Sequence, residues 1–144
     1  INPARLWDLF CGVGGFALHC AAPDRDIIGI EIESEAIACA RDSAVQMGME
    51  NLRFESIDAA SFGADSGKTP GAVIVNPPRR GLGEQLCRWL EKVSSEYLIY
   101  SSCNPLTLAK DIEKLTSYEI EKVQLFDMFP HTEHYEVLVL LKKR

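Results

Sequence analysis

Residues 6–15, LWDLFCGVGG, join a short apolar run to a turn with three glycines, and this combination decides the fold. The run predicts a buried strand that ends where the glycines begin. Four more apolar segments predict strands at 26–32, 51–57, 71–75 and 97–100. Helical periodicity is found between and after these strands, at 34–47, 82–93 and 106–115. Strands that alternate with helices predict an α/β domain with a mostly parallel sheet covered on both faces.

The C-terminal part of the chain departs from this alternation. Two apolar runs, 120–126 and 135–141, follow each other without a helix between them. They predict two strands that form an antiparallel hairpin at one edge of the sheet. The sequence therefore predicts one domain, residues 1–144, in which a parallel sheet carries an antiparallel edge.

The composition is that of a soluble globular domain, since 47% of the 144 residues are apolar and 25% are charged. No apolar run approaches the roughly 20 residues that a membrane-spanning helix needs, and no signal peptide opens the chain. Five cysteines without a CxxC pair favour a reduced, cytoplasmic setting over a disulfide framework. They also form no recognisable zinc or iron–sulfur ligand set.

The net charge of −6 disfavours a freestanding nucleic-acid-binding protein, because contacts with phosphates usually require a basic surface. Two explanations stay open at this point. Either the substrate is not a nucleic acid, or most of the electrostatic attraction comes from another part of the protein. Nothing in the sequence indicates an obligate dimer, and we expect a monomer.

The glycine turn predicts a nucleotide-cofactor site. Ligands of such sheets bind at the carboxyl ends of the strands, where Gly12 and Gly14 let the backbone approach a ligand closely. Glu31, at the end of the second strand, can accept hydrogen bonds from both hydroxyls of a ribose. A tight turn beside a solvated glutamate is the structural alternative. The turn also fits the loose dinucleotide pattern Gly12-x-Gly14-x-x-Ala17, so by itself it does not separate NAD from S-adenosylmethionine.

The fourth strand is followed by Asn76-Pro77-Pro78-Arg79, which indicates a ligand-binding turn. Two prolines hold the turn in one shape, and the Asn76 carboxamide offers donors and an acceptor to a cofactor or a nucleobase. Arg79 and Arg80 can bind a phosphate or polarise a carbonyl. An ordinary surface turn with solvated arginines is the alternative.

The fifth strand leads into Ser101-Ser102-Cys103-Asn104-Pro105, which places a cysteine before a predicted helix. A cysteine at a strand end facing the cleft is typical of a reactive thiol. Cys11 also lies at a strand end, but inside the glycine turn. The other three fall in helical stretches and are predicted to be small core residues. These three are Cys20, Cys39 and Cys87.

Residues 126–136, FDMFPHTEHYE, crowd two histidines and several acids into the turn before the last strand. His131 and His134 have no convincing third ligand nearby, so we predict no metal site. A general base in this segment is the favoured interpretation, because a nucleophile is expected at the same sheet edge.

Five motifs together resemble the catalytic domain of the RNA 5-methyluridine methyltransferases, which act on uracil in transfer or ribosomal RNA. They are DLFCGVGGFAL (8–18), GIEI (29–32), NPPRRG (76–81), SSCNP (101–105) and DMFPHTEHYE (127–136). The resemblance covers essentially the whole chain. The residues 129–132 and their neighbours are most similar to the bacterial 23S ribosomal RNA branch, and within it to the smaller enzyme that carries an iron–sulfur cluster.

The resemblance implies a Rossmann-like, S-adenosylmethionine-dependent methyltransferase fold and gives the residues their roles. Cys103 corresponds to a nucleophile that forms a covalent bond to C6 of uracil, and Glu136 to the base that removes the C5 proton. Glu133 occupies a variable position and has no assigned role. The cofactor-binding residues implied by the motifs are Phe10, Gly12, Gly14, Glu31 and Asn76.

The family pattern also contains an upstream region with RNA-binding surface, and in the suspected branch a [4Fe–4S] cluster, neither of which is in these residues. The chain is therefore expected to be the C-terminal fragment of a larger enzyme, which would account for its acidic charge. Other interpretations remain: a transfer RNA enzyme, a noncatalytic nucleotide-binding domain or an NAD oxidoreductase. Amino-methylating enzymes place an aromatic residue where Arg79 stands, and DNA cytosine-C5 enzymes use a Pro-Cys motif that is absent from NPPR.

Overall fold

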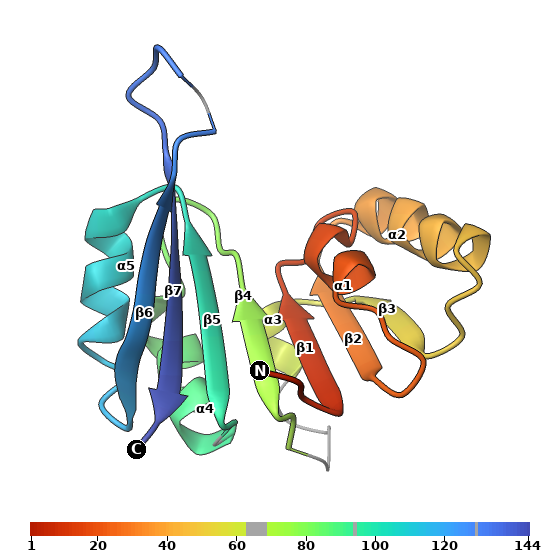
Figure 1. Cartoon of the computed structure of the whole chain (residues 1–144), viewed down its shortest axis with the longest axis horizontal. Helices are drawn as coiled ribbons and strands as arrows, with labels where there is room; N and C mark the ends of the chain where they lie inside the picture. Colours follow the sequence, from red (N-terminus) through yellow and green to blue (C-terminus); the bar gives the residue numbers. More distant parts are fainter. Residues whose placement is uncertain (63–68, 94, 129) are drawn as a thin grey trace.

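The computed structural model describes residues 1–62, 69–93, 95–128 and 130–144; Phe129 of the last motif lies outside them. Within these ranges, a seven-stranded sheet in the order β3-β2-β1-β4-β5-β7-β6 forms the centre of the domain (Figure 1). The strands are β1 (Arg5–Leu9), β2 (Asp26–Glu31), β3 (Leu52–Ser56), β4 (Ala72–Val75), β5 (Tyr97–Ser102), β6 (Tyr118–Phe126) and β7 (Glu136–Lys143). The helices are α1 (Gly15–His19), α2 (Ser34–Gln46), α3 (Ala59–Phe62), α4 (Gly83–Val93) and α5 (Pro105–Ile112).

The predicted topology is confirmed. Strands β1 to β5 pair in parallel, and β7 pairs antiparallel with both β5 and β6. The hairpin of β6 and β7 thus forms the edge of the sheet, with β7 on its inner side. This is a Rossmann-like α/β fold with a reversed C-terminal edge.

Helices cover both faces of the sheet. On one face, Trp7 of β1 packs edge-on against Phe62 of α3 and stacks on Trp89 of α4, with ring centroids 5.0 and 5.8 Å apart. On the other face, Ile37 and Ala40 of α2 pack against β-strand side chains. In Figure 1, α3 and α4 lie behind the sheet and α1 lies in front of it. None of the helices in the described part of the chain is long and apolar enough to cross a bilayer.

The structure differs from the sequence predictions in several details: the short helices α1 and α3 are not predicted, and α5 ends at Ile112 and not at residue 115. Two further differences concern β5 and Cys39. Strand β5 continues beyond Tyr100 through Ser102, because Ser101 and Ser102 pair with β7. Serines favour turns, so this extension depends on pairing with β7, which the local sequence does not predict. The prediction that Cys39 lies in the core is wrong, since its side chain is exposed. Helix α2 buries Ile37 and Ala40, and Cys39 is two residues, or about 200°, around the helix from Ile37.

Candidate functional site

A cavity of about 340 Å³ lies at the carboxyl ends of β1, β2 and β4, the edge of the sheet where ligands of this fold bind. It brings together three of the predicted cofactor-binding residues, Phe10, Glu31 and Asn76. Its full lining is Phe10, Ile30, Glu31, Ile32, Glu33, Asp58, Ala59, Asn76, Pro78 and Arg80. Gly12 and Gly14 do not line the cavity but shape the turn beside it.

The turn after β1 has the backbone that its glycines predict. Gly12 and Gly14 have φ angles of 54° and 86°, in the left-handed region that favours glycine. At Gly14 a Cβ atom would also lie 2.9 Å from the Phe54 ring, so any side chain there would clash with that ring. Phe10 shares the left-handed region with φ of 61°, which costs a non-glycine residue of order 1 kcal/mol. Strain of this kind clusters at ligand sites, and here it falls on a residue that lines the cavity.

The Glu31 carboxylate is fixed by the turn and by its own backbone. Its Oε2 accepts the Gly12 N–H at 3.1 Å, and its Oε1 accepts the N–H groups of Ile32 and Glu33 at 2.8 and 3.2 Å. A carboxylate has about four acceptor positions, so about one remains free in this arrangement. Binding both hydroxyls of a ribose therefore requires one backbone amide to give up its bond.

Asp8 is a fully buried carboxyl group directly before this turn. Its Oδ2 accepts the Ala17 N–H at 3.0 Å, whereas its Oδ1 is buried without a hydrogen-bond partner. Desolvation raises the pKa of Asp8 to about 7; the Ala17 amide opposes this rise and the Glu31 charge adds to it. The strained turn and the spare Glu31 acceptor position fit a ligand that brings hydroxyl donors, as S-adenosylmethionine does.

The predicted nucleophile and base lie next to the last pair of the β5–β7 ladder. In this antiparallel ladder, Ser101 is opposite Leu138 and Ser102 is opposite Val137. Cys103 directly follows Ser102, the last residue of β5, and Glu136 directly precedes Val137 as the first residue of β7. Both residues therefore lie at the same end of this strand pair. The Cys103 side chain is exposed, and the half-buried Glu136 carboxylate accepts a hydrogen bond from the Ser101 hydroxyl at 2.5 Å.

The loop that carries Asn76 is tied to the helix that follows Cys103. The Arg79 carbonyl accepts hydrogen bonds from Asn104 Nδ2 and Thr107 Oγ1, each at 3.1 Å. Asn104 also caps α5, because its Oδ1 accepts the Leu106 N–H at 3.2 Å. These hydrogen bonds therefore hold the loop that carries Asn76 against the N-terminal end of α5, directly after Cys103.

Burial sets three of the other four cysteines apart from Cys103; the fourth, Cys39, is also exposed. It raises the pKa of Cys11 to about 12, with the charges of Asp8 and Glu31 adding to the effect, and it raises the pKa of Cys87 to about 12 and that of Cys20 to a lesser extent. A thiol with a raised pKa is a poor nucleophile at neutral pH. Cys11, the other cysteine at a strand end, is thereby ruled out as the reactive one. Within the described residues, no group of three side chains could hold a metal ion.

Several residues of the site were missed at the level of sequence. Asp58 lines the cavity two residues after β3 ends, and extending the strand-end criterion to the third strand would have found it. Ser101, Asn104 and Thr107 act through hydrogen bonds to partners 25 to 35 residues away, for which the sequence gives no signal.

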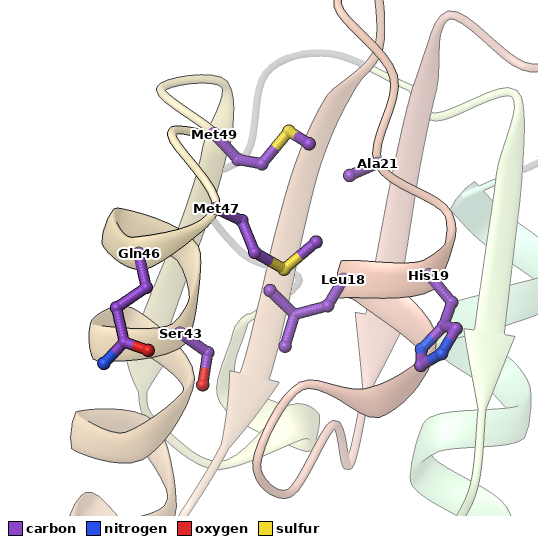
Figure 2. A pocket seen from close by; sticks show the side chains of 7 residues that line it. All are labelled: Leu18, His19, Ala21, Ser43, Gln46, Met47 and Met49. Atoms are coloured by element: carbon purple, nitrogen blue, oxygen red, sulfur yellow. The ribbon is translucent and has the colours of Figure 1, made fainter.

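A larger cavity, about 810 Å³, lies between α1 and α2 and contains none of the predicted residues (Figure 2). Leu18 and Met47 point into the space between the two helices, and Met49 lies above them. It is formed by the C-terminal ends of these helices, whereas ligands of this fold bind at the carboxyl ends of the strands. Size alone would therefore select the wrong site.

Comparisons with known proteins give a consistent result. The family model described as tRNA (Uracil-5-)-methyltransferase matches residues 2–144. The chain is 59% identical over 139 residues to the 23S rRNA (uracil(747)-C(5))-methyltransferase RlmC of Citrobacter koseri, which covers 96% of the chain and 37% of that protein. It is 58% identical over 140 residues to the Escherichia coli protein of the same name, with 97% and 37% covered.

Among solved structures, the tRNA (uracil-54, C5)-methyltransferase of Pyrococcus abyssi in complex with S-adenosyl-L-homocysteine superimposes with a TM-score of 0.86. The two are 33% identical, and the match covers 94% of this chain and 33% of that one. The chain thus spans about a third of the length of these relatives, and the alignment leaves most of each relative without a counterpart.

Proposed function

Because this chain belongs to the tRNA (uracil-5-)-methyltransferase family, we propose that it is the catalytic, S-adenosylmethionine-binding domain of an enzyme that methylates C5 of uracil in 23S ribosomal RNA. The observation that carries the proposal is that Cys103 and Glu136 flank the last pair of the β5–β7 ladder, Ser102 and Val137, at the same sheet edge as the cavity lined by Phe10, Glu31 and Asn76. The identity of 58–59% to proteins named for 23S rRNA favours this substrate over transfer RNA.

In the proposed reaction, the Cys103 thiolate attacks C6 of uracil and forms a C6–S bond. The electrons of the C5=C6 bond move toward the C4 carbonyl oxygen, which gives an enolate that is nucleophilic at C5. Glu136 later accepts the proton from C5. The electron pair of that C–H bond restores C5=C6, and the C6–S pair returns to sulfur as the Cys103 thiolate. One difficult substitution is thereby divided into easier steps.

When bound, S-adenosylmethionine would supply the electrophilic methyl group that C5 takes up, with S-adenosylhomocysteine as the leaving group. Phe10, Glu31 and Asn76 would hold it in the cavity, with the turn at Gly12 and Gly14 giving room for close approach. Its hydroxyl donors suit the Glu31 carboxylate. Uracil must leave its stack to reach Cys103, which implies a flipped base or an unpaired loop as substrate.

We further propose that catalysis and RNA binding are carried out by different parts of a longer enzyme. With a net charge of −6, the chain is a poor partner for RNA phosphates, so we assign RNA binding to a region outside these 144 residues. A [4Fe–4S] cluster, if present, belongs to the same region. The free cysteines are consistent with a reduced, cytoplasmic setting, and we propose that the enzyme acts as a monomer there.

A covalent trap tests the mechanism. The natural full-length protein is incubated with S-adenosylmethionine and a 23S rRNA fragment that contains 5-fluorouracil. Fluorine at C5 cannot be removed as a proton, so a methylated RNA–protein adduct should accumulate and survive a denaturing gel. Cys103→Ala should abolish it, while Cys39→Ala, the matched exposed cysteine on α2, should not.

Two outcomes would contradict the proposal. An adduct that persists in Cys103→Ala would remove the nucleophile from its role. An adduct formed with transfer RNA but not with the 23S fragment would favour the alternative substrate. The absence of any adduct, together with intact binding of S-adenosylmethionine, would instead support a noncatalytic nucleotide-binding domain.

A further inference from the structure

Ser101 is a buried hydroxyl group that touches the proposed base. Only 2% of the residue is exposed, and its Oγ donates a hydrogen bond to Glu136 Oε1 at 2.5 Å. The bond joins neighbouring strands, because Ser101 lies on β5 and pairs with Leu138, two residues beyond Glu136 on β7. It is therefore a diagonal contact within one face of the sheet.

Three functional groups lie at this end of β5 and β7. Ser101 lies two residues before Cys103, which directly follows β5, and its hydroxyl contacts Glu136, which directly precedes the paired Val137. A hydroxyl, a thiol and a carboxylate thus follow one another along the end of the β5–β7 pair.

Glu136 needs such an anchor because of where it stands. It is the first residue of β7, and the segment before it, 130–134, is exposed. A glutamate side chain has three rotatable bonds, and fixing them costs conformational entropy that its surroundings must offset. A short, charge-assisted hydrogen bond from a buried donor can do this, because such bonds are about twice as strong as neutral ones.

We propose that Ser101 is a positioning residue for Glu136: its hydroxyl holds one carboxylate oxygen so that the other faces C5 of the uracil bound at Cys103. The inference rests on the proposed function. Ser101 keeps its own proton throughout and exchanges no electrons with the substrate. Its contribution is therefore confined to the step in which Glu136 removes the C5 proton and Cys103 is released.

Because a positioning residue for the base affects only the step of proton removal, kinetics can distinguish this role of Ser101 from a purely structural one. Ser101→Ala should leave the single-turnover rate of methyl transfer and kcat/KM for RNA unchanged, because both report steps that precede proton removal, and it should lower kcat and KM together. Proton removal should slow about tenfold to a hundredfold, the usual effect of deleting a hydrogen bond to a charged group. The methylated covalent adduct should then accumulate on unmodified RNA, without 5-fluorouracil.

Two isotopes measure the two steps in one experiment. The full-length protein is given RNA with tritium at uracil C5 and S-adenosylmethionine with a ¹⁴C-methyl group. Transfer of ¹⁴C to RNA reports methylation, and tritium in water reports proton removal. In the natural protein the two should rise together; in Ser101→Ala, tritium release should lag behind ¹⁴C transfer. Ser101→Thr keeps the hydroxyl and should restore most of the release rate.

Ser95→Ala is the matched control. Ser95 is also a buried serine whose hydroxyl meets one side-chain partner, the Tyr118 hydroxyl at 3.1 Å, but it lies before the opposite end of β5. It should lose stability without separating the two isotopes. If Ser101→Ala does not fold, Ser101→Cys, which fills similar space with a weaker donor, is used in its place.

The outcomes distinguish the inference from the function on which it rests. A natural protein that forms no 5-fluorouracil adduct at Cys103 would overturn the proposed function itself. A natural protein that forms the adduct, beside a Ser101→Ala variant that releases tritium in step with methyl transfer, would overturn the role of Ser101 alone. Equal slowing of both isotopes would do the same, because a positioning residue for the base affects only the second step.

Discussion

Gly81, in the motif NPPRRG, offers a quantitative test of how the cofactor loop is held. Its φ is 82°, and a Cβ added there would lie 2.4 Å from Asp111 Oδ2. That buried oxygen accepts the Leu82 N–H at 2.7 Å and the Tyr100 hydroxyl at 2.9 Å. Gly81→Ala therefore forces the carboxylate away from two donors, in addition to straining the backbone.

A substitution at the nearby Gly83 separates the cost of backbone strain from the cost of displacing the Asp111 carboxylate. Its φ is 77°, but a Cβ there would meet nothing within 4 Å, so Gly83→Ala carries the backbone strain alone, about 1 kcal/mol. Gly81→Ala should cost about 2 kcal/mol more, the value of one weakened hydrogen bond to a charged group. For a domain of this size the difference corresponds to about 6 °C in Tm. Thermal and urea unfolding of both variants measure it, and equal destabilisation would refute the role assigned to Asp111.

Three further predictions follow from the site. Burial raises the pKa of Asp8 from 3.8 to about 7, so the folded protein keeps a proton that the unfolded chain releases, and the free energy of unfolding should fall as pH rises from about 4 to 7. Asp8→Asn should remove this dependence, worth about 4 kcal/mol in full and about 2.6 kcal/mol between pH 5 and 8, where urea unfolding measures it; an unchanged dependence would contradict it. Glu31→Gln should weaken binding of S-adenosylmethionine about tenfold in calorimetry, because an amide replaces an acceptor of the Gly12 N–H; unaltered affinity would exclude Glu31 from the site. Alkylation at pH 8, followed by mass spectrometry, should modify Cys103 and Cys39 early and Cys11 and Cys87 last, because burial raises the pKa of each of the latter two to about 12; early labelling of Cys11 would contradict its burial.

Much of the fold and part of the site could be predicted from the sequence because both follow from local patterns. The strand-end rule indicates Glu31 and Asn76, the motif resemblance adds Phe10, and these three residues line one cavity. The rule works because parallel strands bring their carboxyl ends to the same edge, whatever the details of packing. Cys103 and Glu136 obtain their roles from motif resemblance, and their position at one end of the ladder depends on the pairing of β5 with β7.

The remainder depends on contacts between distant segments. Asp111 joins the NPPRRG loop to β5, yet in the sequence it is an ordinary acid in a helix. Cys39 illustrates the same limit, because helical periodicity was recognised but the position of one small residue around the helix was not. A periodic pattern predicts that a helix has a buried face more reliably than it predicts which residues at the boundary belong to that face. Hydrogen-bond partners and face boundaries need the packed structure.

The reversed edge of the sheet explains how three chemical roles meet at one place. Five parallel strands bring only their carboxyl ends to the site edge, and these provide the cofactor loops and the cysteine. A further parallel strand would contribute another carboxyl end only after a long crossover. Because β7 runs antiparallel to β5, its amino end arrives at that edge instead, and Glu136 is its first residue. The antiparallel ladder that turns β7 around also carries the Ser101 contact to the Glu136 carboxylate. The hairpin thus places the proposed base and, through Ser101, restrains it, which predicts that shifting the β5–β7 register would disable proton removal before it disabled cofactor binding.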